Sequence, residues 1–321
     1  MNIHMKAVFL DFATMGPELN IDALHRVLPG IEIFEITRND QIAERIKGAH
    51  FVLGNKARIT AAHIRDNPTL RYIGLTATGT DNVDTAAAKA SKVAVTNIRA
   101  YCAESIAEHV FGCLLMLSRN LGQYNTAIRA GEWQTSTDFC LLSYPMRELN
   151  AMTLGILGYG NLGKGVASLA EAFGMEVLIS ARPGSNKVEQ GRVAFQELLQ
   201  RADVISLHCP LTDDTAGLFA AAQFEAMKSD AVLVNTARGG LVDSTALASA
   251  LKNGQIGGAA IDVLPEEPPI NGDPLLDYAG PNLIITPHVA WGSDKARQAA
   301  VDQLTENIAA FIAGKQRRRV V

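Results

Sequence analysis

The sequence has no strong excess of charge of either sign. Among its 321 residues, 29 Lys and Arg stand against 33 Asp and Glu, which gives a formal net charge of -4 at pH 7. So small a charge produces no long-range attraction to nucleic acid or to an anionic membrane surface, and we expect neither as a partner. Three arginines at positions 317–319 form the only basic cluster, and we interpret them as a solvated chain end rather than a phosphate site.

Cysteine is scarce, and long hydrophobic runs are missing. Cys102, Cys113, Cys140 and Cys209 lie too far apart for a zinc knuckle or a C-x-x-C redox pair. We therefore expect no metal site, and reduced thiols in a cytoplasmic protein. The longest apolar stretch, around residues 110–117, is less than half as long as a membrane span. We expect neither a secretory leader nor a contact with a membrane.

The sequence does contain enough apolar material for large cores. Hydrophobic residues make up 48% of the chain and charged residues 19%, which excludes a disordered or highly solvated protein. At about 100 to 200 residues per domain, a chain of this length suggests two domains.

Short apolar runs alternate with stretches of helical spacing, which is the pattern of βαβ units on a parallel sheet. A first series of strands is predicted at residues 6–10, 31–36, 50–53, 71–75 and 93–96, with helices between them, for example at 21–28 and 83–90. A second series is predicted at residues 153–157, 176–180, 204–208, 232–236, 258–263 and 283–286. Six strands is the number in a complete dinucleotide-binding sheet.

Two long helices frame the second series. The first is predicted to run without interruption over residues 103–130, because helical spacing continues there without a proline. An irregular segment with Trp133, Phe139 and Pro145 follows it, and we place a domain boundary just before the helix. The second spans residues 293–313 and has no strand after it, so we expect it to return to the first domain.

A glycine-rich motif follows the first strand of the second series. It reads Gly158, Tyr159, Gly160, Asn161, Leu162 and Gly163 and opens a predicted helix. Between a strand and a helix, G-x-G-x-x-G predicts a dinucleotide site: the first glycine permits a tight turn, the second lets backbone approach the pyrophosphate, and the third lets helix and strand pack closely. The anion would lie at the helix N-terminus. The alternative is a glycine-rich turn without a ligand.

The next strand does not end in the acidic residue that would hold the ribose hydroxyls of NAD. It ends instead in Ser180, Ala181 and Arg182. An uncharged Ala181 removes repulsion against a 2′-phosphate, and the Arg182 guanidinium and the Ser180 hydroxyl could bind that phosphate. The sequence therefore favours NADP(H) over NAD(H). In the alternative interpretation, Arg182 is an exposed bystander beside a site that accepts either cofactor.

Three later strands are followed by charged residues. Arg238 lies after the strand at 232–236, Glu267 after that at 258–263 and His288 after that at 283–286. Ligands of doubly wound sheets bind beyond the carboxyl ends of the strands, so these residues are candidates for a site.

These segments resemble the D-isomer-specific 2-hydroxyacid dehydrogenases in order, spacing and context. The resemblance covers essentially the whole chain and is carried by residues 77–84, 158–163, 235–242, 258–268 and 286–291. Within the family the sequence is most similar to the glycerate dehydrogenase (hydroxypyruvate reductase) branch, on the segments 145–149, 266–269 and 287–291.

The resemblance implies a catalytic set. It assigns Arg238 to the substrate's carboxylate and carbonyl oxygen, His288 to proton transfer and Glu267 to the support of that histidine. The chemistry agrees, because reduction of a 2-oxo acid builds negative charge on oxygen and needs a fixed cation and a proton donor. A neighbouring carboxylate also favours the charged imidazolium and fixes the ring.

The resemblance also implies further contacts. The backbone of Thr78 and Gly79 would bind the substrate carboxylate, with Asn55 and Trp291 lining the pocket. The cofactor would meet a set of residues at the strand ends, namely His208, Cys209, Pro210, Thr236, Ala237, Asp262 and His288. Asp262 would face the nicotinamide carboxamide.

Some of these residues have plainer interpretations. The alternative interpretation of Asp262 is a residue that only caps a helix or turn, and Asn55 is a turn residue as readily as a pocket residue. His109, in the apolar run of a long helix, is interpreted as a core residue rather than a catalytic one. His208 and Cys209 are not interpreted as zinc ligands, because no second pair accompanies them.

Together these features predict an α/β fold of two doubly wound parallel-sheet domains. Residues 1–101 would form a flavodoxin-like substrate domain, 102–288 a Rossmann-type NAD(P)-binding domain, and 289–321 a C-terminal helix that returns to the substrate domain. The predicted activity is NAD(P)H-dependent reduction of hydroxypyruvate or glyoxylate to the D-2-hydroxy acid, D-glycerate or glycolate, and the reverse oxidation. The helix from Ala103 and the Trp133–Pro145 segment resemble the element that joins two subunits in this family, which implies a homodimer.

Two alternatives stay open. One is another D-2-hydroxyacid dehydrogenase, such as a phosphoglycerate-type enzyme, for which only Lys56 and Arg58 are candidate phosphate ligands. The other is a nucleotide-sensing, corepressor-like binding protein, since fold alone does not fix function.

Overall fold

The computed structural model describes residues 5–185 and 187–321. By contacts between residues the chain forms two compact units: unit 1 comprises the chain up to Cys102 together with Gly292–Val321, and unit 2 comprises Ala103–Trp291. None of the described helices combines the length and the apolar composition that crossing a bilayer requires.

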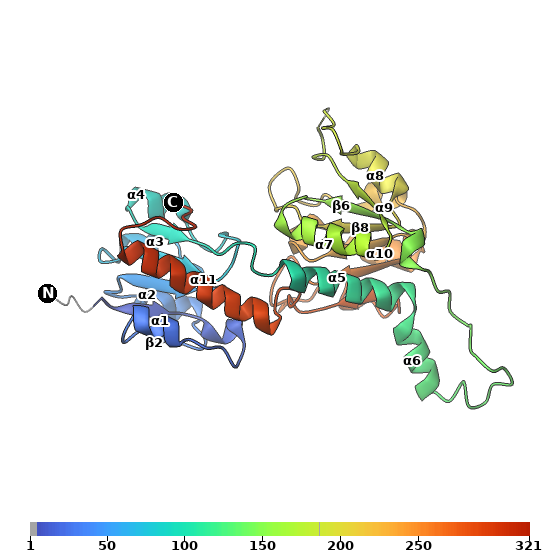
Figure 1. Cartoon of the computed structure of the whole chain (residues 1–321), viewed down its shortest axis with the longest axis horizontal. Coiled ribbons are helices and arrows are strands. Elements are labelled where there is room, and N and C mark those ends of the chain that lie inside the picture. Colours follow the sequence, from blue (N-terminus) through green and yellow to red (C-terminus); the bar gives the residue numbers. More distant parts are fainter. Residues whose placement is uncertain (1–4, 186) are drawn as a thin grey trace. The chain divides into compact units, whose positions relative to one another are not determined.

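Unit 1, drawn in blue, cyan and red in Figure 1, contains a five-stranded sheet in the order β2-β1-β3-β4-β5, with every pair parallel. Its strands are β1 (Ala7–Phe9), β2 (Glu32–Ile33), β3 (Phe51–Gly54), β4 (Tyr72–Leu75) and β5 (Ala94–Thr96). Its α-helices are α1 (Asp22–Val27), α2 (Ile42–Arg45), α3 (Ala61–Arg65), α4 (Thr85–Ala90) and α11 (Asp294–Ile312), and its 3-10 helices are η1 (Phe12–Met15) and η2 (Asn39–Gln41). This strand order is the flavodoxin-like one, as the sequence predicted.

The sheet of unit 1 is covered by a helix from the far end of the chain. On β4, Gly74 leaves room for α11, because a Cβ there would lie 2.6 Å from Leu304 Cδ1. The rings of Tyr72 and Phe311 lie 4.9 Å apart. Parallel strands are buried on both faces, and α11 supplies this cover for β4.

The edge of β5 is occupied by the last residues of the chain. Val320 donates its N–H to Val95 O at 2.8 Å, and Thr96 forms an antiparallel bridge with Arg319. Arg317 and Arg318 bind Glu306, at 2.7 and 2.9 Å. The arginine run interpreted as a solvated chain end is therefore held on the protein, because its backbone supplies hydrogen bonds that an edge strand lacks.

Unit 2 contains a six-stranded sheet in the order β11-β10-β9-β8-β6-β7, again with every pair parallel. Its strands are β6 (Thr153–Leu157), β7 (Glu176–Ile179), β8 (Val204–Leu207), β9 (Val232–Asn235), β10 (Gly258–Ile261) and β11 (Leu283–Ile285). Its α-helices are α5 (Ala103–Ser118), α6 (Leu121–Arg129), α7 (Asn161–Ala172), α8 (Phe195–Arg201), α9 (Ala221–Ala226) and α10 (Ser244–Lys252), with 3-10 helices η3 (Leu149–Ala151) and η4 (Gly239–Leu241).

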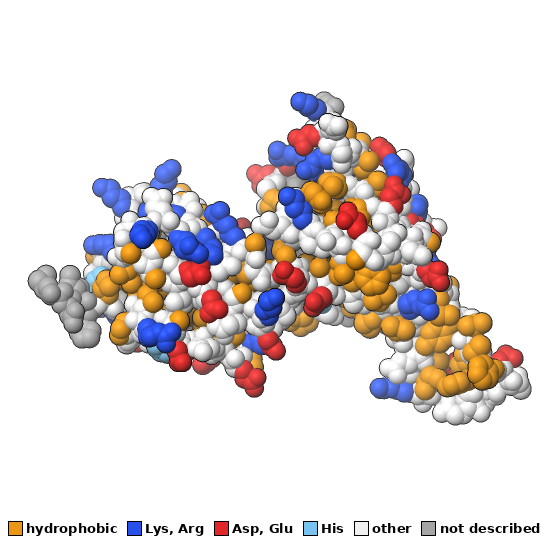
Figure 2. Space-filling model, in the orientation of Figure 1, with side chains coloured by type: hydrophobic (Ala, Val, Ile, Leu, Met, Phe, Trp, Pro, Cys, Tyr) orange, Lys and Arg blue, Asp and Glu red, His pale blue; other side chains and the backbone are white. Residues whose placement is uncertain are grey.

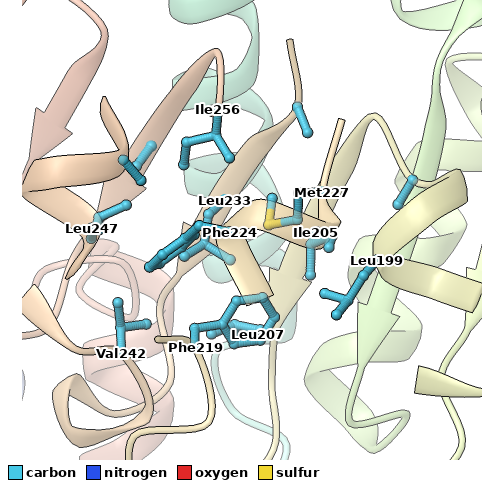
Figure 3. Close-up of a cluster of buried hydrophobic side chains, with 14 of the residues drawn as sticks. Leu199, Ile205, Leu207, Phe219, Phe224, Met227, Leu233, Val242, Leu247 and Ile256 are labelled. Carbon is cyan, nitrogen blue, oxygen red and sulfur yellow. The ribbon is translucent and has the colours of Figure 1, made fainter. Parts of the chain in front are cut away.

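A single parallel bridge from Ser180 to Val193 lies beyond β7. Counting it as a reduced third strand gives the 3-2-1-4-5-6 order of a dinucleotide-binding sheet, followed by one more strand. The direction of winding reverses between β6 and β8. Apolar side chains of β8 and β9 pack against Phe219 and Phe224 to form the core that holds this part of the sheet rigid (Figure 3).

The prediction of one helix over residues 103–130 was wrong. The helix stops at Ser118 and a second one starts at Leu121, because Asn120 adopts the left-handed conformation with φ 50°. Asn tolerates this region better than other non-glycine residues. Its side chain also holds the break, since Nδ2 donates to Pro145 O and Oδ1 accepts from Gln123 Nε2, each at 2.6 Å. The strand predicted at 31–36 is also shorter, and only Glu32–Ile33 pairs with β1.

Candidate active site

The three charged residues lie at the carboxyl ends of neighbouring strands. Arg238 follows β9, Glu267 follows β10 and His288 follows β11, and these strands are adjacent in the sheet. Because the strands are parallel, their carboxyl ends share one edge. The fold therefore brings these segments to the same edge of unit 2.

Glu267 and His288 form a direct pair. Glu267 Oε2 lies 2.7 Å from His288 Nδ1, and both side chains are partly exposed. The other oxygen, Oε1, accepts the backbone N–H of Leu264 at 3.0 Å. Since both carboxylate oxygens are engaged, the glutamate is fixed and in turn fixes the plane of the ring.

The arginine segment packs directly against the segment that carries Glu267. A Cβ at Gly239 would lie 2.0 Å from the Leu264 carbonyl carbon and 2.4 Å from Pro265 N, so only glycine allows this approach. The Asn235 side chain shapes the turn, because it donates to Arg238 O at 2.9 Å and accepts from Ala237 N at 3.0 Å. Arg238 itself donates from Nη1 to Ala237 O at 2.8 Å.

Asp262 is buried at the end of β10, and its carboxylate holds the segment on either side of His288. Oδ1 accepts the Val289 N–H and Oδ2 the Ala290 N–H, each at 2.9 Å. The Thr286 hydroxyl donates to Oδ1 at 2.5 Å. The contact of Asp262 with the nicotinamide carboxamide stays a prediction.

Each residue proposed for substrate binding is described within its own unit. Trp291 belongs to unit 2, and its Nε1 donates to His288 O at 3.1 Å. Asn55, Thr78 and Gly79 belong to unit 1. Asn55 is buried and donates from Nδ2 to Thr14 Oγ1 at 3.0 Å. Thr78 is exposed, and Gly79 follows it in the turn after β4. Their roles at a substrate stay predictions.

The glycine motif has the geometry of a pyrophosphate cradle. Gly158 has φ 98°, and a Cβ there would lie 2.5 Å from the backbone of His208 and Cys209. A Cβ at Gly163 would lie 2.2 Å from Gly158 O, whereas Gly160 faces open space at the start of α7. The turn thus exposes free N–H groups at a helix N-terminus, at the point where the sheet reverses its winding. Asn161 opens α7 and is exposed, while Tyr159 and Leu162 are partly buried.

A cavity of about 480 Å³ adjoins this turn. It lies at the carboxyl ends of β6, β7 and β8 and is lined by Leu157, Gly158, Ser180, Ala181, Arg182, Pro183, Ser185, Lys187, Glu189, Arg192, Cys209, Pro210, Thr212 and Thr215.

The cationic lining of this cavity extends beyond the predicted residues. Arg182 is exposed and pairs with Asp214 at 2.5 Å. Arg192 donates to Ser180 O at 2.8 Å, and Lys187 also lines the cavity. The Ser180 hydroxyl, by contrast, is buried and donates to Ala181 O at 2.7 Å. Sequence reasoning missed Lys187 and Arg192, because the loop after β7 has no regular spacing that would reveal its return to Ser180.

Two strand-end residues fit a bound dinucleotide in different ways. Burial lowers the pKa of His208 to about 4, so its ring is neutral near pH 7 and contributes structure rather than proton transfer. Its Nε2 lies 2.8 Å from Ser206 Oγ. Thr236 Oγ1 is buried and has no hydrogen-bond partner among the described residues, which suits a hydroxyl that meets a ligand.

The parallel sheet, its glycine turn and the charged residues at the strand ends define a nicotinamide-dependent oxidoreductase. The sequence profile of the D-isomer specific 2-hydroxyacid dehydrogenase, NAD binding domain, matches residues 111–290. The chain belongs to this family, which confirms the resemblance drawn from the motifs.

Individual relatives agree with this membership. A glycerate dehydrogenase of Methylorubrum extorquens is 47% identical over 277 residues, covering 86% of this chain and 87% of the relative. A hydroxypyruvate reductase of Blautia hydrogenotrophica is 32% identical over 97% of this chain and 98% of its own. The crystal structure of a D-lactate dehydrogenase from Aquifex aeolicus with NAD and lactic acid matches with a TM-score of 0.79 at 28% identity, over 96% of both chains.

Proposed function

We propose that this protein reduces hydroxypyruvate to D-glycerate, and also glyoxylate to glycolate, and catalyses the reverse oxidations. The Glu267–His288 pair at 2.7 Å, beside the Arg238 segment, is the observation that carries the proposal. The names of the glycerate dehydrogenase and hydroxypyruvate reductase relatives support the choice of substrate.

His288 acts as the proton donor in this proposal. When bound, the reduced nicotinamide supplies a hydride to the carbonyl carbon. Negative charge then develops on the carbonyl oxygen, and a proton from His288 neutralises it. Because Glu267 occupies Nδ1, Nε2 is the ring atom left to face the substrate.

Arg238 binds the substrate in this proposal. Its planar guanidinium forms a bidentate pair with a carboxylate, and lysine cannot reproduce that geometry. We further assign Asn55, Thr78, Gly79 and Trp291 to substrate binding, as the family resemblance implies. Unit 1 is accordingly the substrate-binding domain and unit 2 the cofactor-binding domain.

NADPH is the preferred reductant in this proposal, and NADH is a weaker one. Ala181 stands where a carboxylate would repel a 2′-phosphate. Arg182, Lys187 and Arg192 line the adjoining cavity, and they outnumber the two carboxylates paired with them, Asp214 on Arg182 and Glu189 on Arg192. A phosphate monoester held by several cations gains strong charge-assisted hydrogen bonds.

We also propose that two copies of the chain form a homodimer through α6 and the segment after it. Hydrophobic side chains gather over this part of unit 2 (Figure 2). They include Leu121, Trp133, Leu142 and Phe139, the last 92% exposed. A patch of this kind marks an interaction surface. Light scattering after size exclusion should give twice the 34.4 kDa mass, and a monomer at micromolar concentration would contradict the proposal.

One experiment tests the enzymatic proposal directly. NADPH and NADH consumption is followed with a panel of 2-oxo acids, for the wild type and for Arg238→Gln. The variant should lose turnover while its affinity for NADPH, from fluorescence titration, stays the same. Arg201→Gln is the matched control, because Arg201 lies on α8 and pairs with Glu197 at the surface. Full turnover by the Arg238 variant would refute the assignment, and no oxidation of NADPH by any acid would favour a binding protein.

A further inference from the structure

A single residue, Asp262, accepts four hydrogen bonds from the segment that carries His288. Its backbone carbonyl accepts the His288 N–H at 2.8 Å. Its carboxylate accepts from the Thr286 hydroxyl and from the N–H groups of Val289 and Ala290. Pro287 has no N–H to donate. The path of the chain from 286 to 290 is therefore set by Asp262.

His288 needs such support because its backbone is strained. It has φ 57°, in the left-handed region that residues with a side chain seldom adopt. A residue in this region relaxes unless its surroundings over-determine it. Disruption of the hydrogen bonds to Asp262 is therefore expected to shift the position of the His288 imidazole.

Helix α5 reaches this segment from the other side. Ser105 donates from Oγ to Ala290 O at 2.7 Å. His109 Nε2 lies 3.2 Å from Thr286 Oγ1 and 4.0 Å from Asp262 Oδ1. Since the Thr286 hydroxyl gives its only proton to Asp262, it can only accept from His109, so His109 must carry a proton on Nε2.

The contact between His109 and Thr286 places the N–H of His109 near the Asp262 carboxylate, which is buried away from water. The Asp262 side chain is 2% exposed, and a buried charge is stable only when it is paired or fully hydrogen-bonded. Cys113 lies on the same helix, and its pKa is raised to about 11. Burial is the larger cause of this shift, and the negative charge of Asp262 is the second. His109 lies four residues before Cys113, and its Nε2 lies 4.0 Å from Asp262 Oδ1.

We propose that His109 is a positioning residue for the reaction. From α5 it binds the Thr286 hydroxyl, which in turn binds Asp262. It thereby fixes the segment that presents His288, and so sets the position from which the proton is given. This inference rests on the proposed function, in which His288 is the proton donor. It adds a positioning role to the interpretation of His109 as a core residue rather than a catalytic one.

Paired variants distinguish the effect of the His109–Thr286 hydrogen bond from the effect of side-chain volume at these two positions. His109→Gln keeps an N–H donor near the position of Nε2, and His109→Met fills similar volume without one. Thr286→Ser and Thr286→Val make the same comparison at the hydroxyl. Glu108→Gln, exposed on the same helix, is the surface control. Each variant is assayed with hydroxypyruvate and NADPH for kcat, KM, the NADPH dissociation constant, the solvent deuterium isotope effect and the melting temperature.

His109→Met and Thr286→Val should lower kcat by about tenfold and increase the solvent isotope effect, because misplacement of about an ångström slows the transfer step. KM and the NADPH dissociation constant should stay within about twofold, and His109→Gln and Thr286→Ser should restore most of kcat. An unchanged kcat in His109→Met, a loss that Gln does not rescue, or a parallel loss of NADPH affinity would overturn the inference.

His288→Asn, measured in parallel, distinguishes failure of this inference from failure of the proposed function. If His288→Asn abolishes turnover and His109→Met does not alter it, only the positioning role fails. If His288→Asn keeps full turnover, the proposed proton donor is wrong, and the positioning role fails with it.

Discussion

The substitution Gly239→Ala tests how the packing of the segment that carries Arg238 affects catalysis, because it alters that packing without changing any charge in the site. The added Cβ would lie 2.0 Å from the Leu264 carbonyl carbon, whereas ordinary contact starts at 3.4 Å, so the two segments must move apart by about 1.4 Å, the difference between these distances. The atoms it meets are backbone rather than the end of a flexible side chain, and the strain cannot be relieved by a rotamer change. Arg238 would therefore be displaced relative to Glu267 and His288 while every charge in the site is kept.

A displacement of this size should lower kcat/KM by about 100-fold, which corresponds to about 2.7 kcal/mol of lost transition-state stabilisation. The free energy of unfolding should fall by about 1 to 3 kcal/mol, which leaves a folded protein. Steady-state kinetics with hydroxypyruvate and NADPH and chemical denaturation measure the two effects.

Gly112→Ala is the matched control for this prediction, since a Cβ there meets nothing within 4 Å. It should leave kcat/KM unchanged. If Gly239→Ala kept more than half of the wild-type kcat/KM, the close approach of the arginine segment to the Glu267 segment would have no role in catalysis, and the geometry argued above for Arg238 would be refuted.

Three other predictions follow from the structure. Ala181→Asp should raise the kcat/KM ratio of NADH to NADPH by about tenfold or more through repulsion of the 2′-phosphate, and an unaltered ratio would show that the basic cavity lining does not select the cofactor. Burial lowers the pKa of His208 from 6.5 to about 4, because the folded state favours the neutral ring. The contribution of His208 to the free energy of unfolding is therefore fully present above pH 6.5. The free energy of unfolding should fall by about 3 kcal/mol as the pH drops from 6.5 towards 4. Denaturant melts of His208→Gln should lack this dependence, and an equal slope in both proteins would contradict it. Val320→Pro removes the N–H bound to Val95 O and should destabilise unit 1 by about 1 kcal/mol, seen as a lower melting temperature for that unit, whereas an unchanged melt would show that the tail contributes nothing to stability.

Local pattern was enough to predict the glycine turn and the strands that flank it, because the G-x-G-x-x-G spacing between a strand and a helix is a local signal and Gly163 packs against Gly158 and Ile156. The close approach of Gly158 to the backbone of His208 and Cys209 is a contact that this local pattern does not contain. Arg238, Glu267 and His288 could also be predicted as a group, since parallel strands place their carboxyl ends on one edge whatever the packing beneath them. The sequence thus predicted which segments meet.

What the sequence could not predict depends on side chains that meet through irregular backbone. The break at Asn120 rests on one left-handed residue that helical spacing does not reveal. Lys187 and Arg192 line the cavity because the loop returns to Ser180. His109 lies 177 residues from Thr286 along the chain, and nothing in the local pattern of α5 distinguishes it from a core histidine.

The discontinuity of unit 1 has a consequence for biosynthesis. Unit 2 is one continuous stretch, but the sheet of unit 1 is covered by α11, which the ribosome makes about 190 residues after Cys102. During that interval the faces of Phe51 and Tyr72 that later pack against Phe311 lack their cover. We therefore expect unit 2 to finish folding before unit 1, although synthesis of unit 1 begins first. Until translation passes Ile312, the N-terminal third of the chain is the part that most needs a chaperone.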